Sequence, residues 1–186
     1  MTRVGRDPVA AVLGLVVAAL AACHSTPEGA PPPGGTYFTQ STLQYEQNRY
    51  RTTNYRRGFV LPVNTKVTLV SMDDAEIVVR ILDSGAELTV ENVPKHTNDT
   101  TLGAFGKLFA AAPADLSRFS ESEQQSIRAG HATVGMSRDA VLAALGYPPA
   151  VGTPSLDEPV WKYWDSRFTT FVVRFDGSGH VVEAGR

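Results

Sequence analysis

The chain has 186 residues, a formal net charge of −2 and a single cysteine, and 42% of its residues are hydrophobic. A charge balance this close to neutral excludes the strongly basic surface that marks a nucleic-acid-binding domain. The apolar fraction is ordinary for a globular protein, and one cysteine forms no disulfide framework. We therefore expect hydrophobic cores alone to stabilise the fold.

The first 22 residues have the pattern of a secretory signal peptide. Arg3 and Arg6 precede an unbroken apolar run over residues 9–22, and small residues lie directly before Cys23. This run is shorter than the roughly 20 apolar residues of a membrane-spanning helix. Residues 20–23, LAAC, resemble the lipobox of bacterial lipoproteins, which implies cleavage before Cys23 and its acylation. A buried structural cysteine is the alternative.

Residues 23–36 are rich in proline and glycine, which predicts a partly stiff spacer between lipid and folded part. The residue after Cys23 is His24. In such lipoproteins an aspartate at this place commonly signals retention in the inner membrane. The resemblance therefore implies a lipid-anchored protein of the bacterial outer membrane that faces the periplasm.

Residues 37–58 interleave tyrosine and arginine. This texture suits contact with anionic glycans or lipid headgroups, by charge and by cation–π interaction. A solvated strand, or a segment packed on the body, is the alternative. The candidate contacts to an anionic surface are Arg49, Arg51, Arg56 and Arg57.

Residues 59–93 predict a small β-meander. Three runs rich in β-branched residues, 59–72, 75–82 and 86–93, are separated by polar turns at Asp73 and Asp83. The string LPVNTKV within the first run resembles bacterial SH3-like modules. A helix is expected over Thr101–Ala112, before Pro113.

Residues 116–186 predict the order α-α-β-β-β. Ser120 and Glu123 form a capping box that begins one helix, which runs to Ala129, and Ser137 caps a second helix that ends at Leu145. A hairpin turn is expected over residues 176–179. The strand candidates are Val160–Trp164, Phe168–Phe175 and His180–Ala184.

A family resemblance covers residues 131–186. VGMSRDAVLAALGYPP is followed by WKYW and then by FVVRFDGSGHVV. This combination resembles the SmpA/OmlA (BamE-like) family of outer-membrane lipoproteins. The resemblance implies two helices packed on a three-stranded antiparallel sheet, and an accessory role in outer-membrane β-barrel assembly or envelope integrity through protein contacts and anionic lipid. The matching positions are Gly135, Met136, Leu145, Gly146, Pro148, Trp161, Tyr163, Phe175, Asp176 and Gly179.

The sequence thus predicts an α+β protein with a β-rich, SH3-like domain and a BamE-like two-layer domain. The expected divisions are a signal peptide over 1–22, a lipidated cysteine and linker over 23–36, and domains over 37–115 and 116–186.

One end of the predicted strand Val160–Trp164 is a candidate partner surface. Trp161 and Trp164 should lie on opposite faces of the strand, so one of them is expected to point away from the core. Tryptophan, tyrosine and arginine dominate interface energetics. Burial of both tryptophans is the alternative. The candidate surface comprises Trp161, Tyr163, Trp164, Arg167 and Phe168.

The sequence contains no nucleophile elbow, P-loop or dinucleotide fingerprint, and its histidines lack metal-ligand spacing. We expect no enzyme, no cofactor and no metal. The leading hypothesis is a non-catalytic binding module that contacts envelope proteins, among them the barrel-assembly machinery, and no nucleic acid. The alternative is an adaptor in secretion, peptidoglycan attachment or inhibition of an exported enzyme. A weak enzyme is a third hypothesis, which a deep polar cleft containing His96 or Asp74 would favour.

Overall fold

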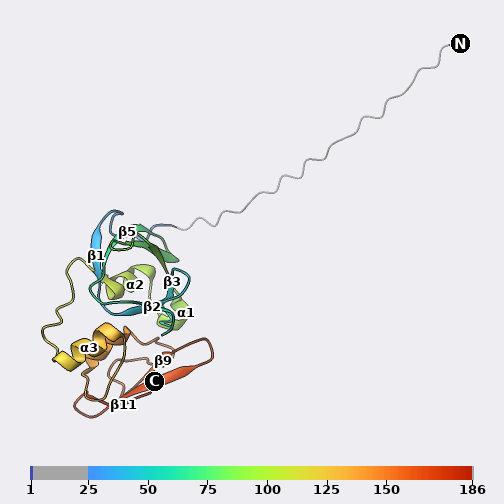
Figure 1. Ribbon diagram of the computed structural model, residues 1–186. Coiled ribbons are helices and arrows are strands. Elements are labelled where there is room, and N and C mark those ends of the chain that lie inside the picture. The colour runs from blue at the N-terminus through green and yellow to red at the C-terminus, as the bar shows by residue number, and fades with distance from the viewer. Residues whose placement is uncertain (2–24, 186) are drawn as a thin grey trace.

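The computed structural model describes Met1 and residues 25–185, and Cys23 and the predicted signal peptide lie outside the described folded part. The fold is α+β, with a curved six-stranded mixed sheet in the N-terminal half (Figure 1). Strand β3 runs parallel to β7, and the other neighbours are antiparallel. In order across the sheet, the strands are β3 (Arg49–Arg51), β7 (Glu87–Glu91), β6 (Glu76–Ile81), β5 (Lys66–Met72), β1 (Thr36–Thr39) and β8 (Phe109–Ala110).

The first core lies between this half-barrel and helix α2 (Thr101–Leu108), which packs into the concave side of the sheet (Figure 1). Alternate residues of β5, β6 and β7 point into this core, and these strands pair in chain order, so the meander predicted from three β-branched-rich runs is confirmed. A short helix, α1 (Pro94–Thr97), joins β7 to α2. The buried residues of the first core include Leu43, Leu69, Ile77, Leu88, Phe105 and Phe109.

The two larger differences from the sequence prediction lie in the N-terminal half, whereas the strands expected from Phe168 and His180 begin at Thr170 and Val181. The run 59–72 is split by a turn in which the amide of Thr65 donates to the carbonyl of Pro62, because proline cannot continue a ladder. Its first part, β4 (Phe59–Leu61), pairs with β2 (Leu43–Tyr45) in a separate sheet. The helix expected over 101–112 ends at Leu108, since the next two residues pair with β1 as β8.

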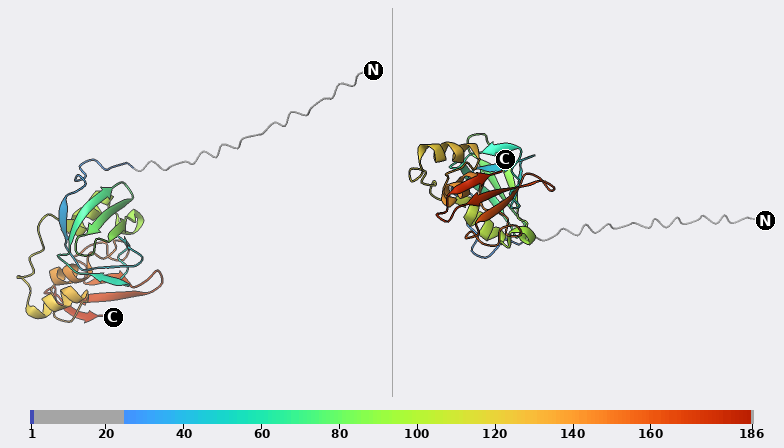
Figure 2. Two further views of the ribbon diagram at one scale, coloured as in Figure 1. Left: turned by 45° about the horizontal axis from the view of Figure 1, so that its top comes forward. Right: turned by 90° about the horizontal axis from the view of Figure 1, so that it is seen from below.

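The C-terminal half has the predicted α-α-β-β-β order. Helices α3 (Glu121–Ala129) and α4 (Arg138–Leu145) cover one face of an antiparallel sheet in the order β11–β10–β9 (Figure 2). A second core lies between them, built around Ile127, Leu145, Trp161, Tyr163 and Val173. The strands are β9 (Val160–Trp164), β10 (Thr170–Phe175) and β11 (Val181–Ala184).

The segment expected to be a spacer packs against the body over much of its described length. Ala30 lies on the first core, and Gly29 lies against Leu102 of α2. The amide of Gly34 donates to the carbonyl of Leu69 at 2.8 Å, which extends the pairing with β5. Residues 29–35 therefore belong to the folded body rather than to a free tether.

One carboxylate caps both C-terminal helices at their N-terminal ends. Glu123 Oε2 accepts hydrogen bonds from the amide and hydroxyl of Ser120 at 3.0 and 2.9 Å, which completes the predicted capping box of α3. Glu123 Oε1 accepts from the amide and hydroxyl of Ser137, the N-cap of α4, both at 3.0 Å. A negative charge at two helix N-termini also suits both helix dipoles.

One guanidinium binds the opposite ends of the same helices. Arg56 is fully buried. Its Nη1 donates to the carbonyl of Leu145 at the end of α4, at 3.1 Å, and its Nη2 donates to that of Gly130, the C-cap of α3, at 3.3 Å. It also donates to the carbonyls of Ala144 and Thr42, at 3.2 and 3.0 Å. A side chain from the segment before β4 thus holds the C-terminal half in place.

Replacing Arg56 by methionine would remove the guanidinium donor from each of these buried carbonyl groups, although the carbonyl of Leu145 keeps a donor in Nδ2 of Asn54 at 2.7 Å. Because each such acceptor costs about 1–3 kcal/mol, we expect Arg56→Met to lower the free energy of unfolding by at least about 3 kcal/mol. Urea denaturation followed by circular dichroism measures the loss. The control is Arg57→Met, since Arg57 is half exposed and forms an ion pair with Glu46 at 2.6 Å. That variant should lose less than about 1 kcal/mol, and equal losses would contradict the structural role of Arg56.

The shared cap predicts a dependence of stability on pH. Partial burial of Glu123 opposes its ionisation, but the hydrogen bonds from Ser137 and Ser120 outweigh this effect and lower its pKa below the ordinary 4.5. Since the folded-state pKa is the lower one, the stabilisation is full above the unfolded pKa and is lost as the pH falls through the folded one.

We expect the urea midpoint of the wild-type protein to fall more steeply between about pH 5 and about pH 3 than that of Glu123→Gln, which lacks the ionisable cap. The neighbouring variant Glu121→Gln serves as the control, because Glu121 is exposed in the first turn of the same helix. It should keep the wild-type slope. Parallel curves for wild type and Glu123→Gln would rule out the shared cap as the cause.

Candidate functional site

Three of the four arginines predicted to contact an anionic surface lie at the surface, each beside a carboxylate. Arg51 and Arg49 both bind Glu91, with N–O distances of 3.0 and 3.4 Å, and Arg57 binds Glu46. The side chains involved are a third to a half exposed, so each pair adds little to stability. Their charges are largely compensated locally.

The fourth predicted contact, Arg56, is not at a surface. Its guanidinium lies between the two cores, and its charge opposes the burial that raises the pKa of Tyr50 to about 12 on one side and the pKa of Tyr163 on the other. Arg56 is therefore corrected from an anion contact to a structural residue. The interleaved tyrosines and arginines carried no signal that distinguished it from its neighbours.

The candidate partner surface also divides into buried and exposed residues. Trp161 and Tyr163 are buried, because they share the inward face of β9. The Trp161 indole donates to the carbonyl of Leu156, and the Tyr163 hydroxyl donates to that of Gly146. These two side chains belong to the second core and offer no contact to a partner.

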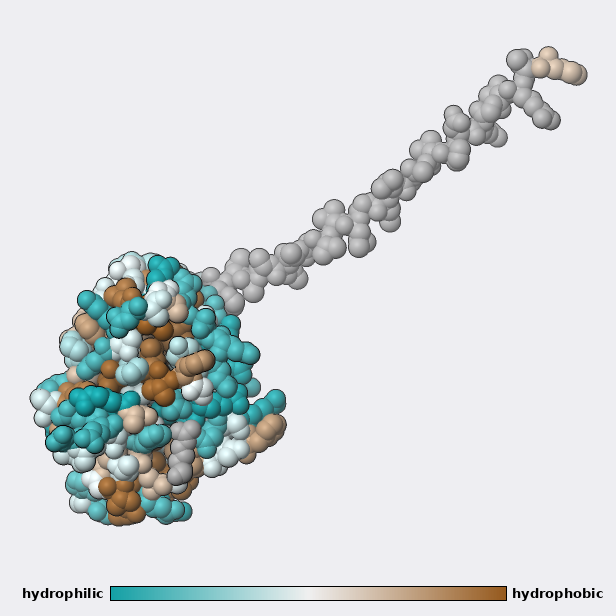
Figure 3. Space-filling model, in the orientation of Figure 1, coloured by the Kyte–Doolittle hydropathy of each residue, from teal (hydrophilic) through white to brown (hydrophobic). Residues whose placement is uncertain are grey.

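The other three predicted surface residues lie outside that core. Trp164 is half buried on the outward face of β9, while Arg167 and Phe168 form the tip of the β9–β10 hairpin. This hairpin projects from the body (Figure 2). Phe168 is 88% exposed, and the Arg167 guanidinium lies 5.7 Å from its ring. On the face shown in Figure 3, apolar and hydrophilic groups lie side by side.

A cleft between the two halves brings members of both predicted sets together. It has a volume of about 370 Å³. The backbone of Arg56 holds its two sides together, because its amide donates to the carbonyl of Trp164 at 2.8 Å and Tyr55 pairs with Trp164 across a β-bridge. The lining residues are Arg51, Thr53, Tyr55, Glu91, Val93, Lys95, His96, Val151, Trp164 and Arg167.

The cleft is electropositive in a protein that is acidic overall. Three cations, Arg51, Lys95 and Arg167, face one carboxylate, Glu91, which binds Arg51. Among the described residues, no carboxylate lies within ion-pair distance of Lys95 or Arg167. Two uncompensated cations at one concavity give it an attraction for anions.

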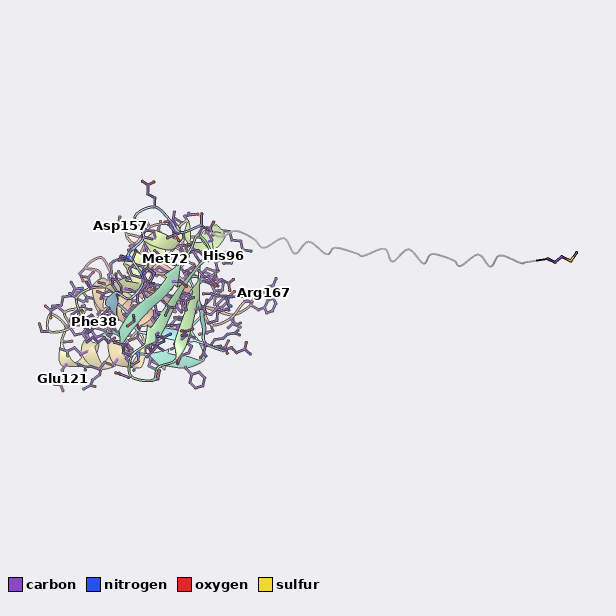
Figure 4. The ribbon with its side chains drawn as sticks, turned by 90° about the horizontal axis from the view of Figure 1, so that it is seen from above. Phe38, Met72, His96, Glu121, Asp157 and Arg167 are labelled. Carbon is purple, nitrogen blue, oxygen red and sulfur yellow. The ribbon has the colours of Figure 1, made fainter. Side chains whose placement is uncertain are left out.

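The cleft also contains aromatic and imidazole groups in fixed positions. The Trp164 ring lies against Gly152, where a Cβ atom would approach the indole to 2.5 Å, so only glycine permits this placement. His96 Nδ1 lies 3.0 Å from the Thr53 hydroxyl, which orients the imidazole. Figure 4 shows His96 and Arg167 on the same side of the molecule. In the sequence analysis His96 entered only through the enzyme hypothesis, as a residue of a deep polar cleft; the cleft contains His96 but not Asp74, and neither Lys95 nor Thr53 was predicted to line it.

Thr53 is buried at the wall of the cleft, and among the described residues its hydroxyl is the side-chain group that contacts the His96 imidazole. In the part of the chain that the structure describes, no group of three histidine, cysteine or acidic residues is placed to hold a metal ion. No described helix has the length and apolarity to cross a membrane.

The fold and cleft define an α+β protein with a basic, aromatic cleft at the junction of a half-barrel and a helix-covered meander. Compared with known proteins, the chain matches no family model, no curated protein and no solved structure.

Fluorescence quenching tests the electrostatics of the cleft. The chain has two tryptophans, of which Trp161 is buried and Trp164 lines the cleft. We expect iodide to quench Trp164 more strongly than caesium at equal ionic strength, because Lys95 and Arg167 attract the anion. Trp164→Phe should remove the iodide-sensitive fraction. Equal quenching by the two ions would contradict an electropositive cleft.

Proposed function

We propose that the chain is a lipid-anchored, non-catalytic binding module of the bacterial outer membrane, that it faces the periplasm, and that it assists outer-membrane β-barrel assembly or envelope integrity. The observation that carries the proposal is the presence in one chain of the LAAC signal at 20–23 and of the family-like sequence over 131–186. The helix pair over an antiparallel meander is the arrangement that this resemblance implies.

The hairpin tip is the proposed contact to an envelope protein. Arg167 and Phe168 are exposed at the end of β9 and β10, where a partner reaches them without rearrangement of either core. An arginine beside a large aromatic side chain is typical of the few residues that dominate the energy of an interface. In this proposal the half-barrel, which resembles SH3-like modules in the LPVNTKV string, supplies further specificity.

The junction cleft favours a second candidate function, an adaptor in another envelope system. Seven of its ten lining residues come from positions 51–96, outside the segment that carries the family resemblance. A ligand in this cleft would therefore be recognised chiefly by the half-barrel. The family-like half would then serve as a scaffold, since a fold by itself does not determine function.

Affinity purification from detergent-solubilised envelopes, read by mass spectrometry, tests the leading proposal. We expect the wild-type protein to recover barrel-assembly subunits and Cys23→Ala to recover far less of them, because that variant lacks the acylated thiol. Phe168→Ala should weaken recovery by about tenfold, as expected for an interface hot spot.

The matched control is Val134→Ala. Val134 is 70% exposed and lies beside the Gly135–Val181 pairing, near the end of the sheet opposite the hairpin tip. This variant should keep full recovery. Recovery of a different envelope complex by the wild-type protein would favour the adaptor instead.

A further inference from the structure

We propose that the junction cleft is a binding site for an acidic saccharide, a sugar ring that carries a carboxylate or phosphate group. The inference goes beyond the proposed function and rests neither on acylation of Cys23 nor on any protein partner. It depends on the charge, the aromatic groups and the shape of the cleft.

The charge of the cleft selects an anion. Lys95 and Arg167 approach the cleft from opposite halves of the protein, on α1 and on the β9–β10 hairpin. Neither side chain has an ion-pair partner among the described residues. An anionic group between them would receive charge-assisted hydrogen bonds from two sides, which are about twice as strong as neutral ones.

The neighbouring concavity lacks this property. It is lined by Arg49 and Arg57 together with Tyr45 and Glu46, and it shares Arg51 with the cleft. Its arginines already bind carboxylates at the surface. An incoming anion would have to displace those carboxylates there, whereas at Lys95 and Arg167 it displaces only water.

The aromatic lining selects a ring with an apolar face. Tyr55 and Trp164 lie side by side across the bridge between the two halves, and both line the cleft. Aliphatic C–H groups on one face of a sugar carry partial positive charge and pack well on the negative face of an aromatic ring. A small inorganic anion would make no such contact with either ring.

Polar groups of the cleft can form hydrogen bonds with the hydroxyl groups of a sugar. The contact with Thr53 occupies His96 Nδ1, and Nε2 has no partner among the described residues. A neutral imidazole offers a donor or an acceptor there, according to its tautomer, to a sugar hydroxyl. The volume of about 370 Å³ lies within the range of about 300–1,000 Å³ that small-molecule sites occupy.

A membrane surface fits the lining less well. Insertion into a bilayer uses apolar side chains that protrude, and the protruding Phe168 is not part of the cleft lining. The aromatic rings of the cleft are instead half buried within the concavity. The cleft therefore favours a soluble ring that enters it, and an anionic lipid is an outcome to be tested.

Nuclear magnetic resonance on the full protein in a non-ionic detergent tests the proposal. Trigalacturonate is the acidic probe and maltotriose the neutral one of equal length. We expect trigalacturonate to shift the indole resonance of Trp164 and the amide resonances of Lys95 and His96. The indole resonance of Trp161, which is bound to Leu156, should stay in place and serve as an internal reference.

The double variant Lys95→Gln/Arg167→Gln should bind trigalacturonate about a hundredfold more weakly, because it loses two charge-assisted hydrogen bonds and each accounts for about one factor of ten. Lys66→Gln/Arg128→Gln is the matched control, since it removes the same charges from exposed positions outside the cleft. It should bind like the wild type. Unchanged resonances outside the cleft show that both variants fold.

Three results would overturn the proposal. The first is a Trp164 shift with inorganic phosphate at the same concentration as trigalacturonate, which would show that the sugar ring contributes nothing. The second is a Trp164 shift with bicelles containing phosphatidylglycerol but none with trigalacturonate, which would identify a lipid site. Equal shifts with maltotriose would remove the role of charge. None of these results depends on recovery of barrel-assembly subunits, so the two proposals fail independently.

Discussion

The buried guanidinium of Arg56 is the constraint on which the arrangement of the two halves depends. A cation taken out of water must recover its lost hydration from nearby groups, and here carbonyl oxygens at the ends of α3 and α4 supply it. Those carbonyls carry the negative ends of two helix dipoles, so the charge and the helices stabilise each other. The carbonyl of Thr42 is a further acceptor for the guanidinium. The Thr42 hydroxyl also donates to the carbonyl of Ile127 in α3.

The hydrogen bonds of Arg56 and those of Glu123 together fix α3 and α4 at both ends. An anion caps the two N-termini and a cation caps the two C-termini, which leaves α3 and α4 little freedom to move relative to each other. The cleft follows from that rigidity. The Arg56 side chain enters the C-terminal half, so its backbone pairs with β9 and brings Tyr55 beside Trp164. A structural arginine thereby places the aromatic wall of the candidate site.

Local signals predicted the parts of this structure, whereas long-range contacts decided the site. The capping box at Ser120 and the β-branched-rich runs between the turns at Asp73 and Asp83 are readable because their physics acts over a few residues. The ladder between β1 and β8 was missed because it joins residues about seventy positions apart, and pairing there ended the helix early. Arg56 was misassigned for the same reason. Its acceptors at Gly130 and Leu145 are 74 and 89 positions away.

The packing of residues 29–35 on the body bears on how a lipid anchor and the cleft would act together. Gly29 lies against Leu102 at the start of α2, and α2 follows directly on α1, which carries Lys95 and His96. Between Cys23 and Gly29 the chain spans at most about 20 Å, at about 3.3 Å per residue. An acylated Cys23 would therefore hold the body close to the bilayer, with the start of α2 near the attachment point. A ligand at the cleft would then be bound by a protein body that stays next to the membrane.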